Sequence, residues 1–142
     1  MKYDFAGPQW VAFMHGLISE KVAALGDQAK GLDWSFCEVF TDPPAVLSPN
    51  GRPLAWGYVV RGANVEFFDE DLPEAAVRIV ADYDSVLPLA RYDSQGDEAR
   101  SQELAAMSQS LMESGKLVVH GDRSQQDGRI ANLHDPIARV TK

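Results

Sequence analysis

Two histidines and two aspartates, residue types able to move protons, occur close together near the C-terminus: His120, Asp122, His134 and Asp135. An imidazole titrates near neutral pH and can act as a general base. A metal site usually needs about three converging ligands, and this spacing matches no known metal signature. In the structural interpretation, which we favour, Asp122 serves a turn, Asp135 caps a helix and the histidines bind backbone atoms. His120, Asp122 and His134 are kept as candidates for acid–base catalysis, and we expect no metal.

A second pair of carboxylates, Asp82 and Asp84, lies at a predicted junction between a strand and a helix. Two neighbouring carboxyl groups can have separated pKa values and divide acid and base roles between them. However, an Asp or Ser side chain at the start of a helix accepts hydrogen bonds from free backbone N–H groups. We therefore interpret this pair structurally, with Asp84 or Ser85 as the N-cap.

The sequence contains none of the short motifs that bind common cofactors or activate a nucleophile. A glycine-rich phosphate loop, paired Cys-x-x-Cys, His-Glu-x-x-His and Gly-x-Ser-x-Gly are all absent. The single cysteine, Cys37, lies near Phe36 and Val39, which predicts a buried thiol rather than a reactive one. We expect no cofactor.

The chain of 142 residues is long enough for one core, and we expect a single domain over 1–142. Its formal net charge of −8 argues against nucleic acid as a partner and against charge-driven docking on an anionic membrane. No apolar run approaches the ~18 residues needed to span a bilayer, so we expect no stable membrane anchor. With one cysteine and no signal-peptide pattern, the expected location is cytoplasmic.

The first half of the chain predicts one helix followed by four strands. Apolar residues recur at spacings of three, four and seven over residues 8–26, which is typical of a helix that covers a sheet. Residues 33–41, 54–61, 65–68 and 77–81 have strand patterns and are separated by turn residues. The short distance between these turns favours antiparallel neighbours.

The second half of the chain predicts two helices, a strand and a final helical turn. The helices are expected over 85–91 and 97–114, the strand over 116–120 and the turn over 137–140. Strands and helices that are segregated along the chain define an α+β fold. We therefore expect a five-stranded, mainly antiparallel sheet covered by helices, in the order helix, four strands, two helices, strand, helix.

Aromatic residues crowd the predicted strands, and methionine and leucine form the apolar side of the late helix over 97–114. Methionine adapts to varied ligand shapes, and ligand pockets are concave and mostly apolar. We therefore expect a pocket between the late helices and the sheet that binds a small hydrophobic ligand. Its expected lining residues are Trp34, Phe36, Trp56, Tyr58, Leu87, Leu104, Met107, Leu111 and Met112.

Four segments of this chain have residue patterns that also occur in one known family. They are Tyr3-Asp4-Phe5 with Trp10, the strand over 54–60, the junction VRIVADYDSVLPLAR over 77–91 and the strand GKLVVHGD over 115–122. Together they resemble the sterol-carrier-protein (non-specific lipid-transfer) fold family, and the resemblance covers most of the chain. It implies one sterol-carrier-like domain with an apolar tunnel for a fatty acyl chain, a sterol or a related lipid, and no cofactor.

Our first hypothesis is a protein that binds a lipid or other small hydrophobic ligand without catalysis of its own. The alternative is a small α+β barrel enzyme, an isomerase, dehydratase or hydrolase of a cyclic hydrophobic substrate, with His120, Asp122 and His134 in acid–base roles. Such barrels usually open with several helices, whereas this chain opens with one, which favours the first hypothesis. A third interpretation is an interaction module that forms a homodimer through exposed strand edges.

Overall fold

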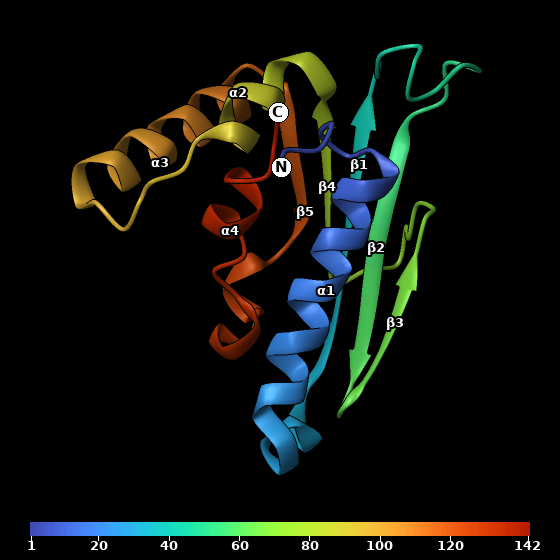
Figure 1. Ribbon diagram of the computed structural model, residues 1–142, viewed down its shortest axis with the longest axis vertical. Helices are drawn as coiled ribbons and strands as arrows, with labels where there is room; N and C mark the ends of the chain where they lie inside the picture. The colour runs from blue at the N-terminus through green and yellow to red at the C-terminus, as the bar shows by residue number, and fades with distance from the viewer.

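Five strands form one mixed sheet in the computed structural model, which describes residues 1–142 (Figure 1). The strand order is β3-β2-β1-β4-β5, so β1 lies in the centre. The strands are β1 Asp33–Thr41, β2 Leu54–Arg61, β3 Asn64–Phe68, β4 Val77–Asp82 and β5 Leu117–Gly121. The helices are α1 Pro8–Leu25, α2 Tyr83–Arg91, α3 Glu98–Glu113 and α4 His134–Ala138, with short 3-10 helices η1 Gly26–Gly31, η2 Arg123–Gln125 and η3 Gly128–Ile130. This arrangement confirms the expected α+β fold and its order of elements.

The sheet is mainly antiparallel, as expected, with one parallel pair between β1 and β4. The parallel pair arises because the chain leaves edge strand β3 and crosses the sheet before β4 begins. The crossing loop is fastened to β1, since Leu72 N–H donates to Cys37 Sγ (3.2 Å) and Ala76 N–H donates to Ser35 Oγ (2.7 Å). Gly57 on β2 leaves room for this loop, because a Cβ atom there would lie 2.8 Å from Leu72 Cδ1.

Alternation along the strands gives the sheet one face that the helices cover, which we call the inner face. On β1, Phe36 lies opposite Tyr58 of β2, and Glu38 lies opposite Trp56 of β2. Cys37 points the other way, toward the crossing loop on the outer face. The inner face consists of Trp34, Phe36, Glu38, Phe40, Leu54, Trp56, Tyr58, Val60, Val65, Phe67, Val77, Ile79, Ala81, Leu117 and Val119.

Helix α1 packs on the inner face. It buries Trp10, Met14, Ile18 and Val22, which recur every four residues. Figure 1 shows the helix running along the strands of the sheet. The other apolar residues of the predicted stripe, Phe13, Leu17 and Leu25, are partly buried beside this core. The burial pattern confirms that the helix covers one face of the sheet.

The two ends of the chain are paired beside α1, and Figure 1 places both termini on the same side of the molecule. Tyr3 N–H donates to Val140 O (2.6 Å), and Lys142 N–H donates to Tyr3 O (2.9 Å). The buried Trp10 Nε1–H donates to Thr141 Oγ1 at 3.0 Å. These bonds hold the segment that follows α4 against the N-terminal end of α1.

Helix α2 begins two residues earlier than the sequence predicted, because its N-cap is Asp82 rather than Asp84 or Ser85. Asp82 is the last residue of β4, and its extended backbone places the carboxylate over the first turn of the helix. The Asp82 carboxylate accepts from Ser85 N–H (3.1 Å) and from Ser85 Oγ–H (2.5 Å). Those hydrogen bonds lower the pKa of Asp82. Asp84 is exposed in the first turn, where a negative charge suits the helix dipole.

Helix α3 has the expected extent, with Asp97 as its N-cap, but it does not cover the sheet. None of its residues is buried, and Figure 1 shows it projecting beside α2 and away from the strands. The helix therefore contributes little to the central core. No helix in the chain combines the length and the apolar character that crossing a membrane requires.

The final helix corrects the predicted position of the last helical turn and the predicted role of Asp135. The helix runs over His134–Ala138 instead of 137–140, and Asp135 lies inside it. The Asp135 carboxylate accepts from Ser94 N–H (2.9 Å) and Ser94 Oγ–H (2.5 Å). Asp135 therefore ties α4 to the loop between α2 and α3 instead of capping a helix.

The observed cap predicts that Asp82→Ala lowers the free energy of unfolding by about 1 kcal/mol, the usual cost of removing an N-cap side chain. Urea unfolding followed by circular dichroism measures this change. Asp84→Ala is the matched control and should change the stability by less than about 0.5 kcal/mol, because Asp84 accepts no capping bond. Equal losses for the two variants would contradict the assignment of Asp82 as the cap.

Candidate functional site

A cavity of about 390 Å³ lies between the inner face of the sheet and the helices that cover it. Thirteen of its eighteen lining residues are hydrophobic, so the space suits an apolar molecule. The strands contribute Phe36, Glu38, Phe40, Trp56 and Tyr58; the N-terminal segment and α1 contribute Phe5, Trp10 and Met14; α2 contributes Val86, Leu89 and Ala90. The remaining lining residues come from the C-terminal part of the chain: Arg123, Gln126, Ala131, Asn132, Leu133, His134 and Ile137.

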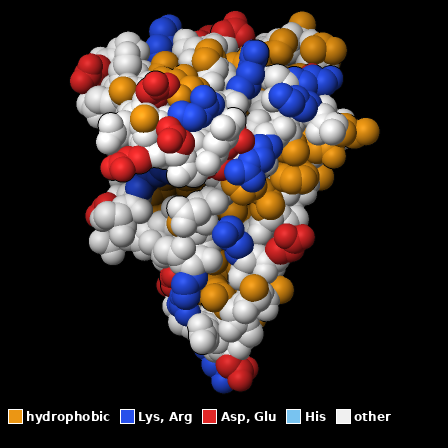
Figure 2. Space-filling model, turned by 60° about the vertical axis from the view of Figure 1, so that its left-hand side comes forward, with side chains coloured by type: hydrophobic (Ala, Val, Ile, Leu, Met, Phe, Trp, Pro, Cys, Tyr) orange, Lys and Arg blue, Asp and Glu red, His pale blue; other side chains and the backbone are white.

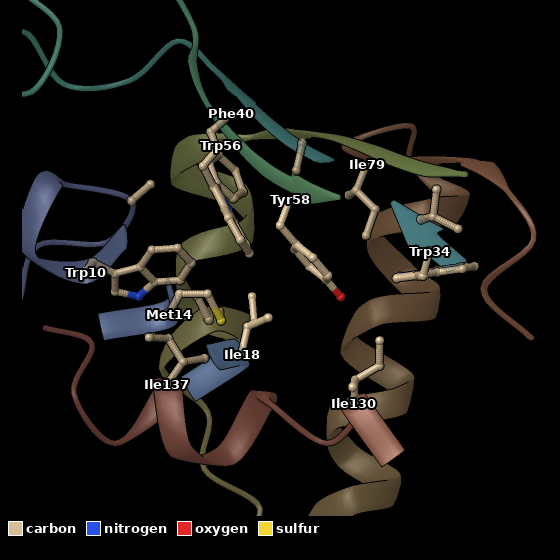
Figure 3. Packing of buried hydrophobic residues seen from close by; sticks show 14 of the residues in the cluster. Trp10, Met14, Ile18, Trp34, Phe40, Trp56, Tyr58, Ile79, Ile130 and Ile137 are labelled. Carbon is tan, nitrogen blue, oxygen red and sulfur yellow. The ribbon is translucent and has the colours of Figure 1, made fainter. Parts of the chain in front are cut away.

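Aromatic rings form the wall of the cavity on the side of the sheet. The ring of Phe36 lies 5.9 Å from that of Trp56 and 6.0 Å from that of Tyr58, measured between centroids. Trp10 approaches Trp56 edge-on, at 6.1 Å and 76°. Figure 3 shows Trp10 and Ile137 on one side of this space and Trp56 and Tyr58 on the other. Burial raises the pKa of the Tyr58 phenol to about 12, so this hydroxyl stays neutral at physiological pH.

One carboxyl group, that of Glu38, lines this apolar cavity. Trp56 Nε1–H donates to Glu38 Oε1 at 3.0 Å. Burial raises the pKa of the Glu38 carboxyl to about 7, although the bond from Trp56 and the positive charge of Arg123 partly oppose the shift. An acidic group is therefore held close to half-protonation at neutral pH, inside a wall of aromatic rings.

The outer wall of the cavity comes from the segment between β5 and α4 and carries most of the polar lining residues. Arg123, Gln126, Asn132 and His134 lie along it. His134 Nε2 is hydrogen-bonded to Tyr92 O at 2.8 Å, which fixes the imidazole beside α2. Figure 2 shows a hollow on this side of the molecule, with hydrophobic side chains inside it and polar atoms around its opening.

The structure brings three of the expected ligand-binding residues, Phe36, Trp56 and Tyr58, to the cavity. Trp34 shares the inner face and is buried, but it does not line the cavity, and its buried Nε1–H has no hydrogen-bond partner. Leu87 packs against the core from α2 without lining the cavity. On α2 the lining positions are Val86, Leu89 and Ala90 instead.

The four expected residues on α3 lie outside the cavity, because α3 packs beside α2 rather than over the sheet. Met107 and Leu111 line a separate shallow groove between α2 and α3. Leu104 is partly buried, and Met112 is 41% exposed. The cavity between the helices and the sheet is therefore bordered by α2 and α4 but not by α3.

The alternative catalytic residues are not brought together. His120 is exposed on edge strand β5, opposite Arg78 on the outer face, whereas His134 lines the cavity on the inner side. The Asp122 carboxylate accepts from Ser124 N–H (2.9 Å) and Ser124 Oγ–H (2.6 Å), and these bonds lower its pKa. No three His, Cys, Asp or Glu side chains are grouped so that they could hold a metal ion.

Sequence reasoning missed several lining residues, of which Glu38 is the most distinctive. Strand alternation alone contained the signal, since Glu38 lies two residues from both Phe36 and Phe40 and must share their face. The residues of the C-terminal segment, such as Ala131 and Leu133, had no comparable signal, because that segment has no regular periodicity.

Comparisons with known proteins bear on the fold. No family model matches the sequence, and no curated protein matches it. Among solved structures, the chain is similar to a conserved hypothetical protein of Thermus thermophilus, described as possibly a sterol carrier protein, with a TM-score of 0.50, 12% identity and coverage of 99% of this chain and 90% of that one. It is also similar to a sterol carrier protein 2 (TM-score 0.46, 13% identity, 96% of each chain) and to a UbiJ-SCP2 ubiquinone synthesis protein (TM-score 0.44, 22% identity, 96% of each chain).

The first of these similarities covers nearly the whole chain and shows its class: the protein has a sterol-carrier-protein-like fold. This finding confirms the resemblance that the sequence suggested.

The raised pKa of Glu38 predicts that the free energy of unfolding of the wild type falls as the pH rises. A Glu38→Gln variant should lack this fall. Because the pKa of Glu38 rises from 4.5 in the unfolded chain to about 7 in the fold, the folded state keeps a proton that the unfolded state releases between these values. The free energy of unfolding should therefore fall, by up to about 3 kcal/mol, as the pH rises across that window. Urea unfolding at several pH values measures the difference between the two proteins.

Glu66→Gln is the control, because Glu66 is an exposed carboxyl on the outer face of β3. Its stability should follow that of the wild type with pH. Parallel pH profiles for Glu38→Gln and the wild type would contradict the raised pKa of Glu38.

Proposed function

We propose that this protein binds a lipid or another small hydrophobic ligand in the cavity, without catalysis of its own. The observation that carries the proposal is an apolar cavity of about 390 Å³ under the helices of a sterol-carrier-like fold. Ligand sites are concave and mostly apolar, and this cavity has both properties. The separation of His120 and Asp122 from His134 leaves the alternative enzyme without an assembled acid–base site.

The size and lining of the cavity favour a compact ligand. Its volume is near the lower end of the range of about 300–1,000 Å³ for small-molecule sites. Each Å² of apolar surface removed from water contributes about 25 cal/mol, so a single alkyl chain or a small ring system would gain most of its affinity from burial. Aromatic walls such as Phe36 and Trp56 offer flat surfaces for either kind of ligand.

The proposal predicts that protein purified without detergent carries a hydrophobic small molecule, which native mass spectrometry would detect. An uncharged, environment-sensitive apolar probe should also bind to the emptied protein. Ala90→Leu should weaken probe binding by about ten-fold, because the extra side chain occupies the cavity. Fluorescence titration measures the affinity.

Ala105→Leu is the matched control, since Ala105 is exposed on α3 and lies outside the cavity. It should bind the probe like the wild type. A protein that is consistently empty and takes up no probe would overturn the proposed function.

We also propose that the protein is cytoplasmic and that nucleic acid is not its partner. A free, buried Cys37 suits the reducing cytoplasm, and the charge of −8 does not suit nucleic acid. Pairing of two chains through edge strand β3 or β5 remains a prediction, because an exposed edge offers unpaired backbone groups. Size-exclusion chromatography with light scattering would distinguish a monomer from a homodimer.

A further inference from the structure

Glu38 occupies the most central position that the inner face offers. β1 is the middle strand of five, and Glu38 lies opposite Trp56 on one neighbour and Ile79 on the other. Every other residue of the inner face is apolar or aromatic. An unpaired carboxyl group in such surroundings is costly, so its presence needs a physical explanation.

The fold satisfies only one of the two carboxyl oxygens of Glu38. Oε1 accepts the bond from Trp56 Nε1–H, while Oε2 accepts no hydrogen bond and is not fully buried, on a residue that lines the cavity. No Lys, Arg or His nitrogen lies within ion-pair distance of the carboxylate. The bond to Trp56 orients the group, so that Oε2 is a free polar contact on the sheet side of the cavity, where the other polar group is the Tyr58 hydroxyl.

We propose that Glu38 Oε2 binds the polar end of the ligand, so that the cavity selects hydrophobic molecules ending in a hydroxyl group over those ending in a carboxylate. This inference rests on the proposed function and adds the chemical class of the ligand. A hydroxyl can donate to the ionised carboxyl of Glu38 and can accept from the protonated one, so it fits both states. A ligand carboxylate would place a second negative charge beside Glu38 in an apolar space, which is unfavourable.

The other polar lining residues come from a different part of the chain than Glu38. Arg123, Gln126 and Asn132 come from the outer wall, whereas Glu38 comes from the central strand. A ligand whose hydroxyl reaches Glu38 would keep its apolar body among the aromatic lining residues Phe36, Trp56 and Tyr58. Molecules with one hydroxyl on an apolar body, such as long-chain alcohols or hydroxylated ring systems, have the required shape.

The test compares dodecanol and dodecanoate, which share one alkyl chain, in displacing an uncharged fluorescent apolar probe from the emptied full-length protein. The wild type should bind dodecanol about ten-fold or more tightly than dodecanoate. Glu38→Leu should lose this preference by binding dodecanol about ten-fold more weakly. Glu38→Gln, which keeps an acceptor oxygen of similar shape, should retain part of it. Glu66→Gln should behave like the wild type.

Each outcome decides the inference. A Glu38→Leu variant that keeps the preference for dodecanol, or a wild type without any preference, would overturn the role of Glu38 while leaving the proposed function intact, provided the probe binds. If neither the probe nor either alkyl ligand binds to any of the proteins, the proposed function itself fails and the inference fails with it. Thermal unfolding of each variant verifies that the proteins compared are folded.

Discussion

The pairing of β1 with a strand on each side is the constraint on which the cavity depends. β1 is antiparallel to β2 and parallel to β4, so its register is fixed from both sides. A slip of one residue would turn Phe36 and Glu38 to the outer face and place Cys37 under the helices. Because both neighbouring strands would have to slip as well, the aromatic wall is as firmly placed as the backbone of the sheet.

The sequence predicted the elements of the fold well and their packing less well. Strand and helix positions followed from local signals, such as the strand pattern over 33–41 and the apolar stripe over 8–26. The parallel pair between β1 and β4 could not be predicted, because it depends on a crossing loop that binds Cys37 and Ser35 through backbone N–H groups. The place of α3 was missed for a similar reason, since its leucines and methionines indicate an apolar side but not the element that this side meets.

The candidate site also has a part that could be predicted from the sequence and a part that could not. The residues on strands could be found, because alternation assigns Phe36, Trp56 and Tyr58 to definite faces. Glu38 obeys the same rule, but a single carboxylate on a strand is usually solvent-exposed, so its charge alone does not indicate a place in a cavity. The outer wall over 123–134 is held by local turns, such as the Asp127 carboxylate accepting from Arg129 N–H, and by the long-range bond from Arg129 Nη1–H to Gln28 O. The bond from Arg129 to Gln28 joins residues that are far apart in the sequence, so no local pattern could predict it.

The pairing of the two chain ends has a consequence for how the chain can be rebuilt. Because Tyr3 is hydrogen-bonded to both Val140 and Lys142, a short linker could join the termini without displacing α4. New ends could open in the exposed turn over 49–53, between β1 and β2. Such a circular permutant would add a covalent link to the hydrogen bonds that join Tyr3 to Val140 and Lys142, and so would fasten the segment after α4 more firmly beside α1.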